Sequence, residues 1–421
     1  MSRWSRSLYL NFRASNLNSH DCTRQREKLL RRAEIVVIGG GVVGASVAYH
    51  LTRAGVNDVL ILERAEQQGS GSTGKATGGV RAQFETNINI KLSLYSIEFF
   101  DNWERDCGYD PKGYLFFATD TAQFEYLRRN VEKQRSLGVR GVELLDCDGV
   151  RKIVPALNCA DIVGGTFGSR DGFIDPLAVM RGFTEGALAY GALIEFGENV
   201  RSIDVANGSV RSVTTDRETI ECDAVVLCSG AWAKELAATA GIDLPVEPQR
   251  RQIVWAKTRT PLPADMPMVI DIGGGFHFRP AIDFGSSEGA AASGCDVLFA
   301  YPDPDEPSSE CMDFDDRFIG KVYEKAKHRA PFLFESDVVR EKCRAGLYEN
   351  SPDHHAILGA CEVGGLYLAN GFSGHGVMHS PATGRALSEI ILEGESKFLD
   401  VSCLSLDRFE KNELLHETAF I

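Results

Sequence analysis

The chain has 421 residues, of which 43% are apolar and 25% are charged, a composition typical of soluble globular proteins, and its length favours two domains over one. The net charge of −14 argues against a nucleic-acid partner, because so acidic a chain is not expected to present a large basic face. No uninterrupted run of about eighteen apolar residues occurs, so no transmembrane segment is predicted.

The first 32 residues form a basic N-terminal extension, with eight Arg or Lys residues and only two acidic ones. On a helical wheel, Trp4, Leu8 and Phe12 share one face, and arginines gather on another. This pattern is typical of a mitochondrial transit peptide, which would place the protein in the mitochondrial matrix. A disordered tail, or a start codon assigned too far upstream, accounts for the same residues, and the protein would then be cytoplasmic.

The segment from 34 to 51, EIVVIGGGVVGASVAYHL, is predicted to form a buried strand, a glycine turn and a helix. The turn fits G-x-G-x-x-G, in which Gly39 makes a tight turn, Gly41 lets a pyrophosphate approach and Gly44 lets the helix pack closely on the strand. A second strand, DVLILER, brings Glu63 to a position suited to the ribose hydroxyls of adenosine. This order predicts a dinucleotide site and leaves FAD and NAD open.

The segment from 67 to 84 is rich in Gly, Ser and Thr and is predicted to be a loop whose N–H groups bind a phosphate or a flat ring; a flexible surface loop is the alternative. Nucleotide-type strand–turn–helix units then recur in the middle and near the end of the chain, so we expect a discontinuous nucleotide domain with a mixed-sheet domain inserted in pieces. The other predicted elements are a helix at 87–105, a strand at 113–120, a helix at 121–137, a helix starting at Asp175–Pro176, a strand–turn–helix unit at 224–233, an antiparallel stretch at 245–306 and a strand–loop–helix unit at 364–392.

The eleven cysteines are scattered and form no C-x-x-C pair, which predicts reduced thiols rather than a disulfide framework or a zinc site. His375 and His379 have metal-ligand spacing, but no carboxylate follows them in a zinc-binding arrangement, and a metal leaves the neighbouring glycines unexplained. No metal is therefore predicted.

Five motifs carry a resemblance to a known family: VVIGGGVVGASVAYHL, GSGSTGKATGGVR, CSGAWA, GLYENSPDHHAILG and GFSGHGVMHSPATGRAL. Over residues 33–395 the chain resembles the D-amino-acid oxidase superfamily of FAD enzymes, in particular the branch with sarcosine oxidase, dimethylglycine dehydrogenase and the β subunits of dye-linked proline dehydrogenase. A mitochondrial FAD-dependent oxidoreductase linked to complex I assembly is similar as well. The resemblance implies an α/β fold, with a discontinuous Rossmann-like FAD-binding domain and an inserted mixed-sheet α+β substrate domain. The expected segments are a basic N-terminal extension at 1–32, FAD-binding segments at 33–112, 175–245 and 341–395, substrate-domain segments at 113–174 and 246–340, and a C-terminal tail at 396–421.

The resemblance also implies which residues hold FAD. A helix that begins just after the last glycine motif would offer free N–H donors and a partial positive charge to the reduced flavin. Relatives tether the flavin covalently at two positions that are Lys75 and Gly346 here, and since neither side chain suits that bond, a non-covalent FAD is predicted. The expected FAD contacts are Gly39, Gly40, Gly41, Val42, Val43 and Gly44 at the pyrophosphate, Glu63 with Arg64 at the adenosine ribose, Ser72, Thr73, Gly74 and Lys75 along the pyrophosphate and flavin, Val200 at the adenine, Ser229 and Gly230 near the phosphates, Gly346, and Gly374, His375, Gly376, Val377 and Met378 at the pyrimidine end of the flavin.

Three residues are the catalytic candidates that the resemblance implies. Arg81 falls where relatives place an arginine that clamps the substrate carboxylate, although a structural ion pair is the alternative. Relatives complete this clamp with a lysine where Met378 stands here, which puts a small free amino acid such as sarcosine in doubt as the substrate. His277, on the strand that faces the flavin in this family, is a candidate base or substrate contact, and a buried structural histidine is the alternative. His375 is the third candidate, because it belongs to the motif beside the flavin.

The first functional hypothesis is an FAD-dependent enzyme that dehydrogenates a secondary or tertiary amine or amino acid, N-methyl or cyclic, to an imine. The alternative is a mitochondrial flavoprotein that acts mainly as an assembly factor of a respiratory complex, and an NAD-linked dehydrogenase ranks third. Sarcosine oxidase-type relatives supply a lysine from the strand that corresponds to 296–303, which contains no Lys or Arg here. Together with Met378, this difference from the relatives predicts slow reaction with oxygen, since a cation near the flavin would stabilise the superoxide-like anion. A dehydrogenase that passes electrons to a quinone, an electron-transfer flavoprotein or a partner subunit is therefore favoured, and a hetero-oligomer is compatible with it.

Overall fold

The computed structural model describes residues 31–281 and 294–418 of the chain. The transit-peptide prediction falls almost wholly outside the described residues. Of the predicted extension only Arg31 and Arg32 are described, and they begin the first strand rather than a tail. Arg31 is held there by ion pairs to Glu195 (2.5 Å) and Glu218 (3.0 Å), partners that lie far away in the sequence. The described residues belong to one compact unit.

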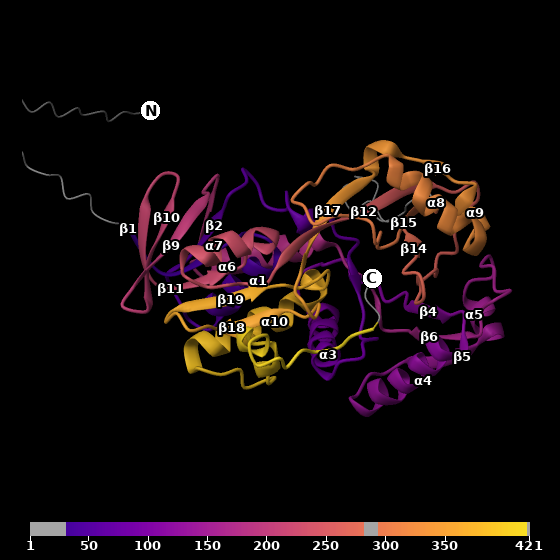
Figure 1. Cartoon of the computed structure of the whole chain (residues 1–421), viewed down its shortest axis with the longest axis horizontal. Coiled ribbons are helices and arrows are strands. Elements are labelled where there is room, and N and C mark those ends of the chain that lie inside the picture. The colour runs from indigo at the N-terminus through magenta and orange to yellow at the C-terminus, as the bar shows by residue number, and fades with distance from the viewer. Residues whose placement is uncertain (1–30, 282–293, 419–421) are drawn as a thin grey trace, which may run out of the picture. The chain divides into compact units, whose positions relative to one another are not determined.

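Two large sheets organise this unit (Figure 1). The first sheet has eight strands: β1 (Arg31–Ile38), β2 (Val59–Glu63), β8 (Leu193–Phe196), β9 (Val200–Ala206), β10 (Ser209–Thr215), β11 (Thr219–Leu227), β18 (Ile357–Ala360) and β19 (Leu366–Asn370). The second has nine strands: β4 (Tyr114–Ala118), β5 (Val142–Asp146), β6 (Gly164–Gly168), β12 (Glu247–Lys257), β13 (Met268–Asp271), β14 (His277–Pro280), β15 (Asp296–Ala300), β16 (Asp337–Val338) and β17 (Arg344–Asn350). A separate ribbon pairs β3 (Gly79–Val80) with β7 (Gly172–Phe173).

The eight-stranded sheet has a parallel centre in the order β19–β11–β1–β2–β8, with β18 antiparallel at one edge and β10 and β9 continuing from β11. The apolar run of β1 follows from burial on both faces. Ile35 and Val37 contribute to the core under the helices, whereas Val36 and Ile38 contribute to the core on the opposite face. The strand therefore shows a continuous apolar run instead of an alternating pattern.

Helices cover both sheets, and on the eight-stranded sheet α1 packs against both α6 and α10, with α3 beside α10 (Figure 1). The predicted start of α6 is confirmed, because the Asp175 carboxylate accepts a hydrogen bond from the N–H of Leu177 (2.9 Å). The helices are α1 (Val42–Arg53), α2 (Ser72–Lys75), α3 (Asn87–Asn102), α4 (Thr121–Ser136), α5 (Cys147–Ile153), α6 (Pro176–Ala189), α7 (Ala233–Thr239), α8 (Arg317–Arg329), α9 (Pro331–Phe334) and α10 (Gly376–Glu393), with 3₁₀ turns η1 (Gly230–Trp232), η2 (Arg340–Lys342), η3 (Ser402–Leu404) and η4 (Leu406–Arg408).

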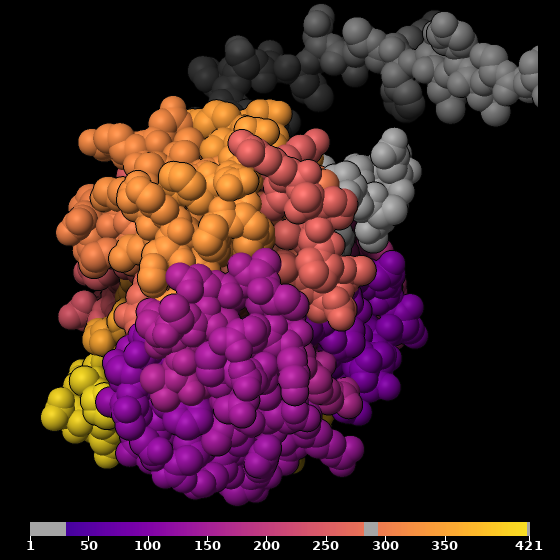
Figure 2. Space-filling view, turned by 90° about the vertical axis from the view of Figure 1, so that its right-hand side faces the viewer, coloured from indigo at the N-terminus to yellow at the C-terminus, as the bar shows by residue number. Residues whose placement is uncertain are grey.

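The nine-stranded sheet joins two distant parts of the chain, because β4 of the earlier part pairs with β13 of the later part. This pairing is parallel, and the other pairings in the sheet are antiparallel. Figure 2 shows the same union on one face, where the purple atoms of the earlier part meet the orange atoms of the later part. Across this boundary the N–H of Asn158 donates to the carbonyl oxygen of Arg329 (2.9 Å). Strand pairing thus unites the two separate substrate-domain segments in one sheet.

The two faces of the nine-stranded sheet differ in what they contact. On one face Val254, Phe299, Phe278, Val269 and Leu115 form a paired row across five strands and belong to a single apolar core. On the other face, the neighbouring paired row consists of Ala300, His277, Ile270 and Phe116. The first three of these residues line the cavity between this sheet and the eight-stranded sheet. Alternation along each strand therefore assigns one face to the core and the other to the site.

The predicted fold class is confirmed: a Rossmann-like α/β part accompanies a mixed-sheet α+β part. One strand differs from the expected segments. The expected FAD-binding segment at 341–395 includes residues 344–350, but β17 pairs with β12 from Glu247↔Asn350 to Ile253↔Arg344 and so belongs to the nine-stranded sheet. A pairing between strands that lie so far apart in the sequence leaves no local pattern.

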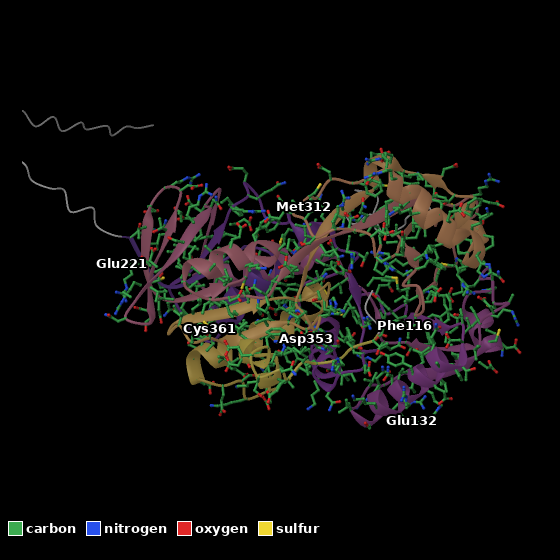
Figure 3. The ribbon with its side chains drawn as sticks, viewed as in Figure 1. Phe116, Glu132, Glu221, Met312, Asp353 and Cys361 are labelled. Carbon is green, nitrogen blue, oxygen red and sulfur yellow. The ribbon has the colours of Figure 1, made fainter. Side chains whose placement is uncertain are left out.

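The C-terminal segment is anchored to the nucleotide-binding part. The guanidinium of Arg408 forms a fully buried ion pair with Asp353 (2.8 Å), which Figure 3 labels below the sheet. The carboxylate of Glu417 accepts hydrogen bonds from the N–H groups of Glu85 (2.6 Å) and Thr86 (3.1 Å), at the start of α3. Within the described part of the chain, no helix combines the length and hydropathy that crossing a bilayer requires.

Candidate active site

A cavity of about 630 Å³ lies between the carboxyl ends of the parallel strands and the site-facing side of the nine-stranded sheet. Ligands of α/β folds bind beyond the carboxyl ends of parallel strands, so this is the expected place for a nucleotide. Ile38, Leu62 and Ala369 line it from the first sheet, and Ile253 and Ala300 line it from the second. Met312, labelled in Figure 3, adds a lining residue from the segment between β15 and α8.

In the glycine turn, Gly39 and Gly44 permit close packing of the backbone, and Gly41 leaves space for a ligand. Gly39 has φ = +105°, and a Cβ there would lie 2.4 Å from the carbonyl oxygen of Cys228. A Cβ on Gly44 would lie 2.0 Å from the carbonyl oxygen of Gly39, so this glycine permits the close approach of α1 to the turn. A Cβ on Gly41 would meet only Thr73 Oγ1, at 3.4 Å. Gly41 and the next two residues, Val42 and Val43, line the cavity at the start of α1, whose first N–H groups have no capping side chain other than Thr73 Oγ1 on Val42 N (3.1 Å).

Glu63 and Arg64 lie at the end of β2 and line the cavity. The Glu63 carboxylate accepts hydrogen bonds from the N–H groups of Gly40 and Ala65, both at 2.9 Å, which fixes it at the mouth of the glycine turn. The guanidinium of Arg64 lies over the Trp232 ring at 3.6 Å, and Val200 lines the same cavity. Gly40 itself is not a lining residue; its N–H positions Glu63.

The Gly/Ser/Thr-rich segment forms the short helix α2, whose residues Ser72, Thr73 and Lys75 line the cavity. Ser72 Oγ donates to the carbonyl oxygen of Leu347 (2.7 Å), so β17 holds this segment in place. Gly74 is not a lining residue, and a Cβ there would lie 2.1 Å from the carbonyl oxygen of Gly69.

Lys75 and Gly346, the two positions at which relatives tether the flavin, are neighbours. A Cβ on Gly346 would lie 2.8 Å from the Cβ of Lys75, and both residues line the cavity. Cys343 is buried away from the cavity and donates its thiol to the Trp255 carbonyl oxygen (3.8 Å).

The turn after β11 contributes Ser229 and Gly230 to the lining. Ser229 Oγ is buried and has no hydrogen-bond partner among the described residues, and it therefore leaves a donor for a ligand. Glu349 Oε2 is likewise buried without a described partner. Burial raises the pKa of Glu349 to about 7, although the N–H groups of Gly371 and Phe372 act in the opposite direction.

Helix α10 begins at the second glycine motif. Gly374 has φ = +95°, and a Cβ there would lie 2.5 Å from the Tyr348 ring. His375 is the N-cap residue, makes no side-chain capping bond and is 5% exposed; burial holds its pKa well below the usual range, so the imidazole is neutral. The five residues of this motif line the cavity: Gly374, His375, Gly376, Val377 and Met378.

These features fit FAD. Two helix N-termini, those of α1 and α10, present free N–H groups to one cavity, which suits the pyrophosphate and the anionic edge of a reduced flavin. The buried, unpartnered Ser229 Oγ and the open space at Gly41 meet the need for a donor and for close approach of a phosphate.

The catalytic candidates Arg81 and His277 face this cavity from different elements. His277 Nδ1 lies 2.8 Å from the carbonyl oxygen of Gly275, so Nδ1 carries the proton and Nε2 keeps a lone pair. Burial lowers the pKa of His277 to about 4, which keeps it neutral at physiological pH. Arg81 is 3% exposed; its guanidinium donates to the carbonyl oxygen of Gln83 (2.5 Å) and lies over the Phe84 ring at 3.9 Å.

Sequence reasoning missed Arg251, Tyr348 and Tyr114, which also line the cavity. Arg251 and Ile253 share one face of β12, so the alternation of RRQIVWA already separates Arg251 from Arg250. Tyr348 comes from β17, whose pairing with β12 the sequence does not reveal.

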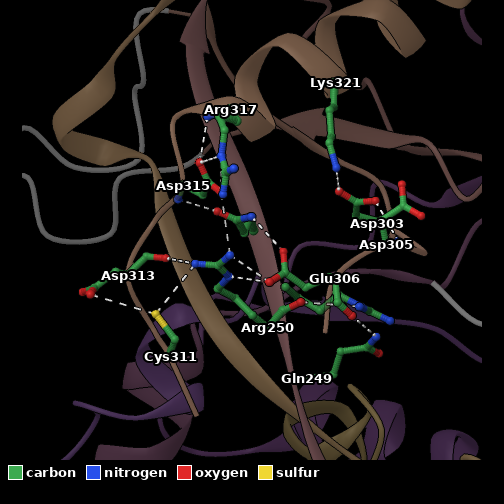
Figure 4. A network of polar contacts seen from close by, with 12 residues as sticks. Gln249, Arg250, Asp303, Asp305, Glu306, Cys311, Asp313, Asp315, Arg317 and Lys321 are labelled. Atoms are coloured by element: carbon green, nitrogen blue, oxygen red, sulfur yellow. Dashed lines mark hydrogen bonds and ion pairs between the residues drawn. The ribbon is translucent and has the colours of Figure 1, made fainter. Parts of the chain in front are cut away.

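Arg250, the neighbour of Arg251 in β12, belongs to the polar network in Figure 4 and not to the cavity lining. Its guanidinium pairs with Glu306 (2.8 Å), lies 3.9 Å from Asp315, and donates to the carbonyl oxygen of Asp313 (2.7 Å). This network fixes the segment between β15 and α8, which bears the cavity-lining Met312.

In residues 31–281 and 294–418, no group of three His, Cys, Asp or Glu side chains is arranged to hold a metal ion. His379, the partner in the metal-type spacing, instead has its Nε2 2.9 Å from Ser93 Oγ. All ten cysteines in the described residues are free thiols.

Comparisons with known proteins agree with this geometry. The family described as FAD dependent oxidoreductase, DAO, matches residues 34–390. FAD-dependent oxidoreductase domain-containing protein 1 of Xenopus laevis is 31% identical, with 92% of this chain and 84% of that protein covered. Mitochondrial dimethylglycine dehydrogenase of Rattus norvegicus is 29% identical over 90% of this chain, which spans only 45% of that protein. L-proline dehydrogenase from P. horikoshii is similar in structure, with a TM-score of 0.82, 29% identity, and coverage of 92% of this chain and 100% of that one. The resemblance that the five motifs predicted is confirmed.

Proposed function

The chain belongs to the DAO family of FAD-dependent oxidoreductases, and we propose that it dehydrogenates a secondary or tertiary amine or amino acid, N-methyl or cyclic, to the imine. The observation that carries the proposal is the shared cavity, in which nucleotide-binding features meet a sheet face that bears a neutral histidine. FAD, the cofactor of the family, supplies the hydride acceptor when it is bound. Water then hydrolyses the imine.

The residues proposed to hold FAD are those around the two helix N-termini. Glu63, fixed by two backbone N–H groups, would accept hydrogen bonds from the ribose, and Ser229 Oγ would donate to a phosphate. We propose that the cofactor is bound without a covalent bond, since Lys75 and Gly346 stand at the tethering positions. Cys228 also lines the cavity, but burial raises the pKa of its thiol, which disfavours the nucleophilic thiolate.

The proposed role of His277 is to orient the amine as a substrate contact. Oxidation needs an unprotonated amine, and a neutral imidazole with a lone pair on Nε2 is able to accept a hydrogen bond from the N–H of that amine. The carbonyl oxygen of Gly275 fixes the tautomer and the ring orientation. His375, neutral and at the start of α10, would exclude water from the flavin side of the cavity, where its ring lies edge-on to Phe84 at 5.0 Å.

The proposed acceptor is a quinone, an electron-transfer flavoprotein or a partner subunit, rather than oxygen. Two relatives of about the same similarity bear the name dehydrogenase, for dimethylglycine and for L-proline, and this supports a dehydrogenase here. Lys75 and Arg251 also line the cavity and add cations from other elements. The mitochondrial relatives support a location in the mitochondrial matrix.

Anaerobic reduction of the bound flavin tests the proposal. The full chain loaded with FAD would be mixed with N-methyl and cyclic amines and amino acids, and the loss of flavin absorbance followed. We expect at least one of them to reduce the flavin within seconds, and His277→Asn to slow that step by about 100-fold, because a misplaced amine loses its alignment with the flavin. If none reduces the flavin, the proposal fails and the assembly-factor hypothesis takes its place.

A further inference from the structure

Glu349 is a cavity-lining acid on β17 whose charge is not compensated. Its Oε2 atom is buried and has no hydrogen-bond partner among residues 31–281 and 294–418. Burial raises the pKa of its carboxyl group to about 7, against the effect of the N–H groups of Gly371 and Phe372, and no charged side chain of the described residues contributes. Because a carboxylate that has left water without a cation is unfavourable, this position favours the neutral acid.

This carboxyl group lies beside the turn that is proposed to hold a phosphate of FAD. A Cβ added to Gly230 would lie 3.9 Å from Glu349 Oε2, and both residues line the cavity. Gly230 follows Ser229, whose buried Oγ is the proposed phosphate donor. The pyrophosphate of FAD is an anion, so its binding adds negative charge near the buried acid, and repulsion then favours the neutral form of that acid.

The other carboxyl groups that line the cavity are stabilised in their ionised form. Glu63 accepts a backbone hydrogen bond at each oxygen. Glu198 also has a buried Oε2 without a described partner, but its Oε1 pairs with the guanidinium of Arg217 at 2.5 Å. Glu235 and Glu310 are exposed, so water solvates their charge. The carboxyl group of Glu349 has neither a paired cation in the described part of the chain nor this exposure.

The groups that face Glu349 from neighbouring elements are uncharged. Cys228 faces it from the end of β11, and burial raises the pKa of that thiol, which keeps the thiol neutral. Asn370, at the end of β19, and Pro248, which is paired with Glu349 on β12, do not ionise. A change in the charge of Glu349 near neutral pH is therefore not offset by a neighbour.

We propose that Glu349 takes up a proton from solvent when FAD binds, so that the retention of the cofactor depends on pH. This inference rests on the proposed placement of a phosphate at Ser229 and Gly230, and it adds a protonation state to the cofactor site. In the FAD-loaded protein the carboxyl group is neutral, whereas in the flavin-free protein it loses its proton as the pH rises through neutrality. Because the flavin-free protein then binds fewer protons than the loaded protein, the affinity for FAD falls as the pH rises.

The release of FAD from the loaded full chain at different pH values tests the proposal. The protein is diluted into buffers from about pH 6 to about pH 9, and the fluorescence of free FAD gives the dissociation constant. We expect the affinity to fall about tenfold per pH unit above about pH 7, and about 100-fold by pH 9. The cavity-lining histidines His277 and His375 stay neutral over this range, so they do not contribute to the change.

Two variants identify the group that titrates. Glu349→Gln keeps the shape of the side chain and cannot ionise, so it should hold FAD at every pH as the unmodified protein does at pH 6. At pH 9 it should therefore bind FAD about 100-fold more tightly than the unmodified protein. Glu310→Gln is the matched control, because it removes a charge from an exposed position of the cavity lining, and it should keep the pH dependence.

Infrared spectroscopy gives a second measurement that needs neither substrate nor variant. The spectrum of the FAD-loaded protein minus that of the flavin-free protein, both at about pH 9, should contain the carbonyl band of a newly protonated carboxyl group. An affinity that is constant from pH 6 to pH 9, an unchanged pH dependence in Glu349→Gln, or the absence of this band would overturn the proposal. If Glu349→Gln fails to fold, the band still decides, and if no amine reduces the flavin, the proposed function fails while these measurements keep their meaning.

Discussion

The nucleotide side and the substrate side of the cavity are built in different ways. On the nucleotide side, glycines and helix N-termini offer backbone groups, and the critical contacts are those in which a Cβ would not fit, as at Gly39 and Gly44. On the substrate side, individual side chains of one sheet face line the cavity, and Arg251, His277 and Tyr348 come from three strands that only pairing brings together.

This difference has a physical cause. A pyrophosphate is recognised by N–H groups and by the absence of side chains, which a short stretch of chain provides by itself. A substrate is recognised by specific charges and proton acceptors, which must converge from distant positions in a buried cavity. The nucleotide side is therefore sensitive to substitutions that add volume, and the substrate side to substitutions that change chemistry.

Gly44→Val should have the largest effect. A Cβ at residue 44 would lie 2.0 Å from the carbonyl oxygen of Gly39 and 3.2 Å from its carbonyl carbon, and this backbone cannot move without opening the turn. We expect stability to fall by more than about 4 kcal/mol and the flavin to be lost, because overpacking at a backbone contact is among the most costly changes. Urea unfolding and the ratio of flavin to protein absorbance measure both. A yellow protein of normal stability would contradict the packing role.

Gly41→Ala separates ligand binding from backbone packing, because it adds one methyl group toward the ligand space and not toward the backbone. The new Cβ would meet only Thr73 Oγ1, at 3.4 Å. We expect the flavin-free protein to keep its stability within about 0.5 kcal/mol, while the affinity for FAD falls by at least about tenfold. Calorimetric titration of the flavin-free protein with FAD measures the affinity. Equal losses of stability in both glycine variants would remove the distinction between packing and binding.

Two buried histidines, one on each side, allow a comparison through pH. Burial lowers the pKa of His50 in α1 and of His277 in β14 to about 4, from the usual 6.5. Because the unfolded chain binds protons more readily, unfolding takes up protons between about pH 6.5 and pH 4, and stability falls as the pH is lowered through this window. Each histidine contributes up to about 3 kcal/mol to the fall.

We therefore expect His50→Gln and His277→Gln each to flatten the dependence of unfolding free energy on pH between 4 and 6.5, measured by urea unfolding at a series of pH values. Only His277→Gln should also change the pH dependence of flavin reduction, because His50 is remote from the cavity lining. A change of that profile in His50→Gln as well would argue that both effects come from general stability.

Met378→Lys should have the smallest structural effect and tests the acceptor. Met378 lies in the first turn of α10, is 8% exposed and lines the cavity. A cation there would stabilise the superoxide-like anion that forms when reduced flavin meets oxygen, so we expect reoxidation by oxygen to accelerate by about tenfold. Stopped-flow reoxidation in air-saturated buffer measures the rate, with Met378→Leu as the neutral control. Fast reoxidation of the unmodified protein, as fast as by an artificial quinone, would refute the proposed dehydrogenase.

The sequence by itself determined the nucleotide side. The strands around EIVVIGGG and DVLILER, the start of α6 at Asp175 and the glycine motif before α10 are local patterns, because hydrogen bonding within a turn or helix and burial on both faces act over a few neighbouring residues. Most residues expected to bind FAD line the cavity, and Gly40, Gly44 and Gly74 lie just behind it.

Only the tertiary structure decided the substrate side. The family resemblance singled out Arg81 in the loop motif, and nothing in the sequence pointed to Arg251. Because β12 pairs with β17 and β15, Arg251 lines the cavity, whereas Arg250 forms an ion pair with Glu306. Such convergence depends on which strands pair and in which register, and that is fixed by the packing of residues hundreds of positions apart, not by any short segment.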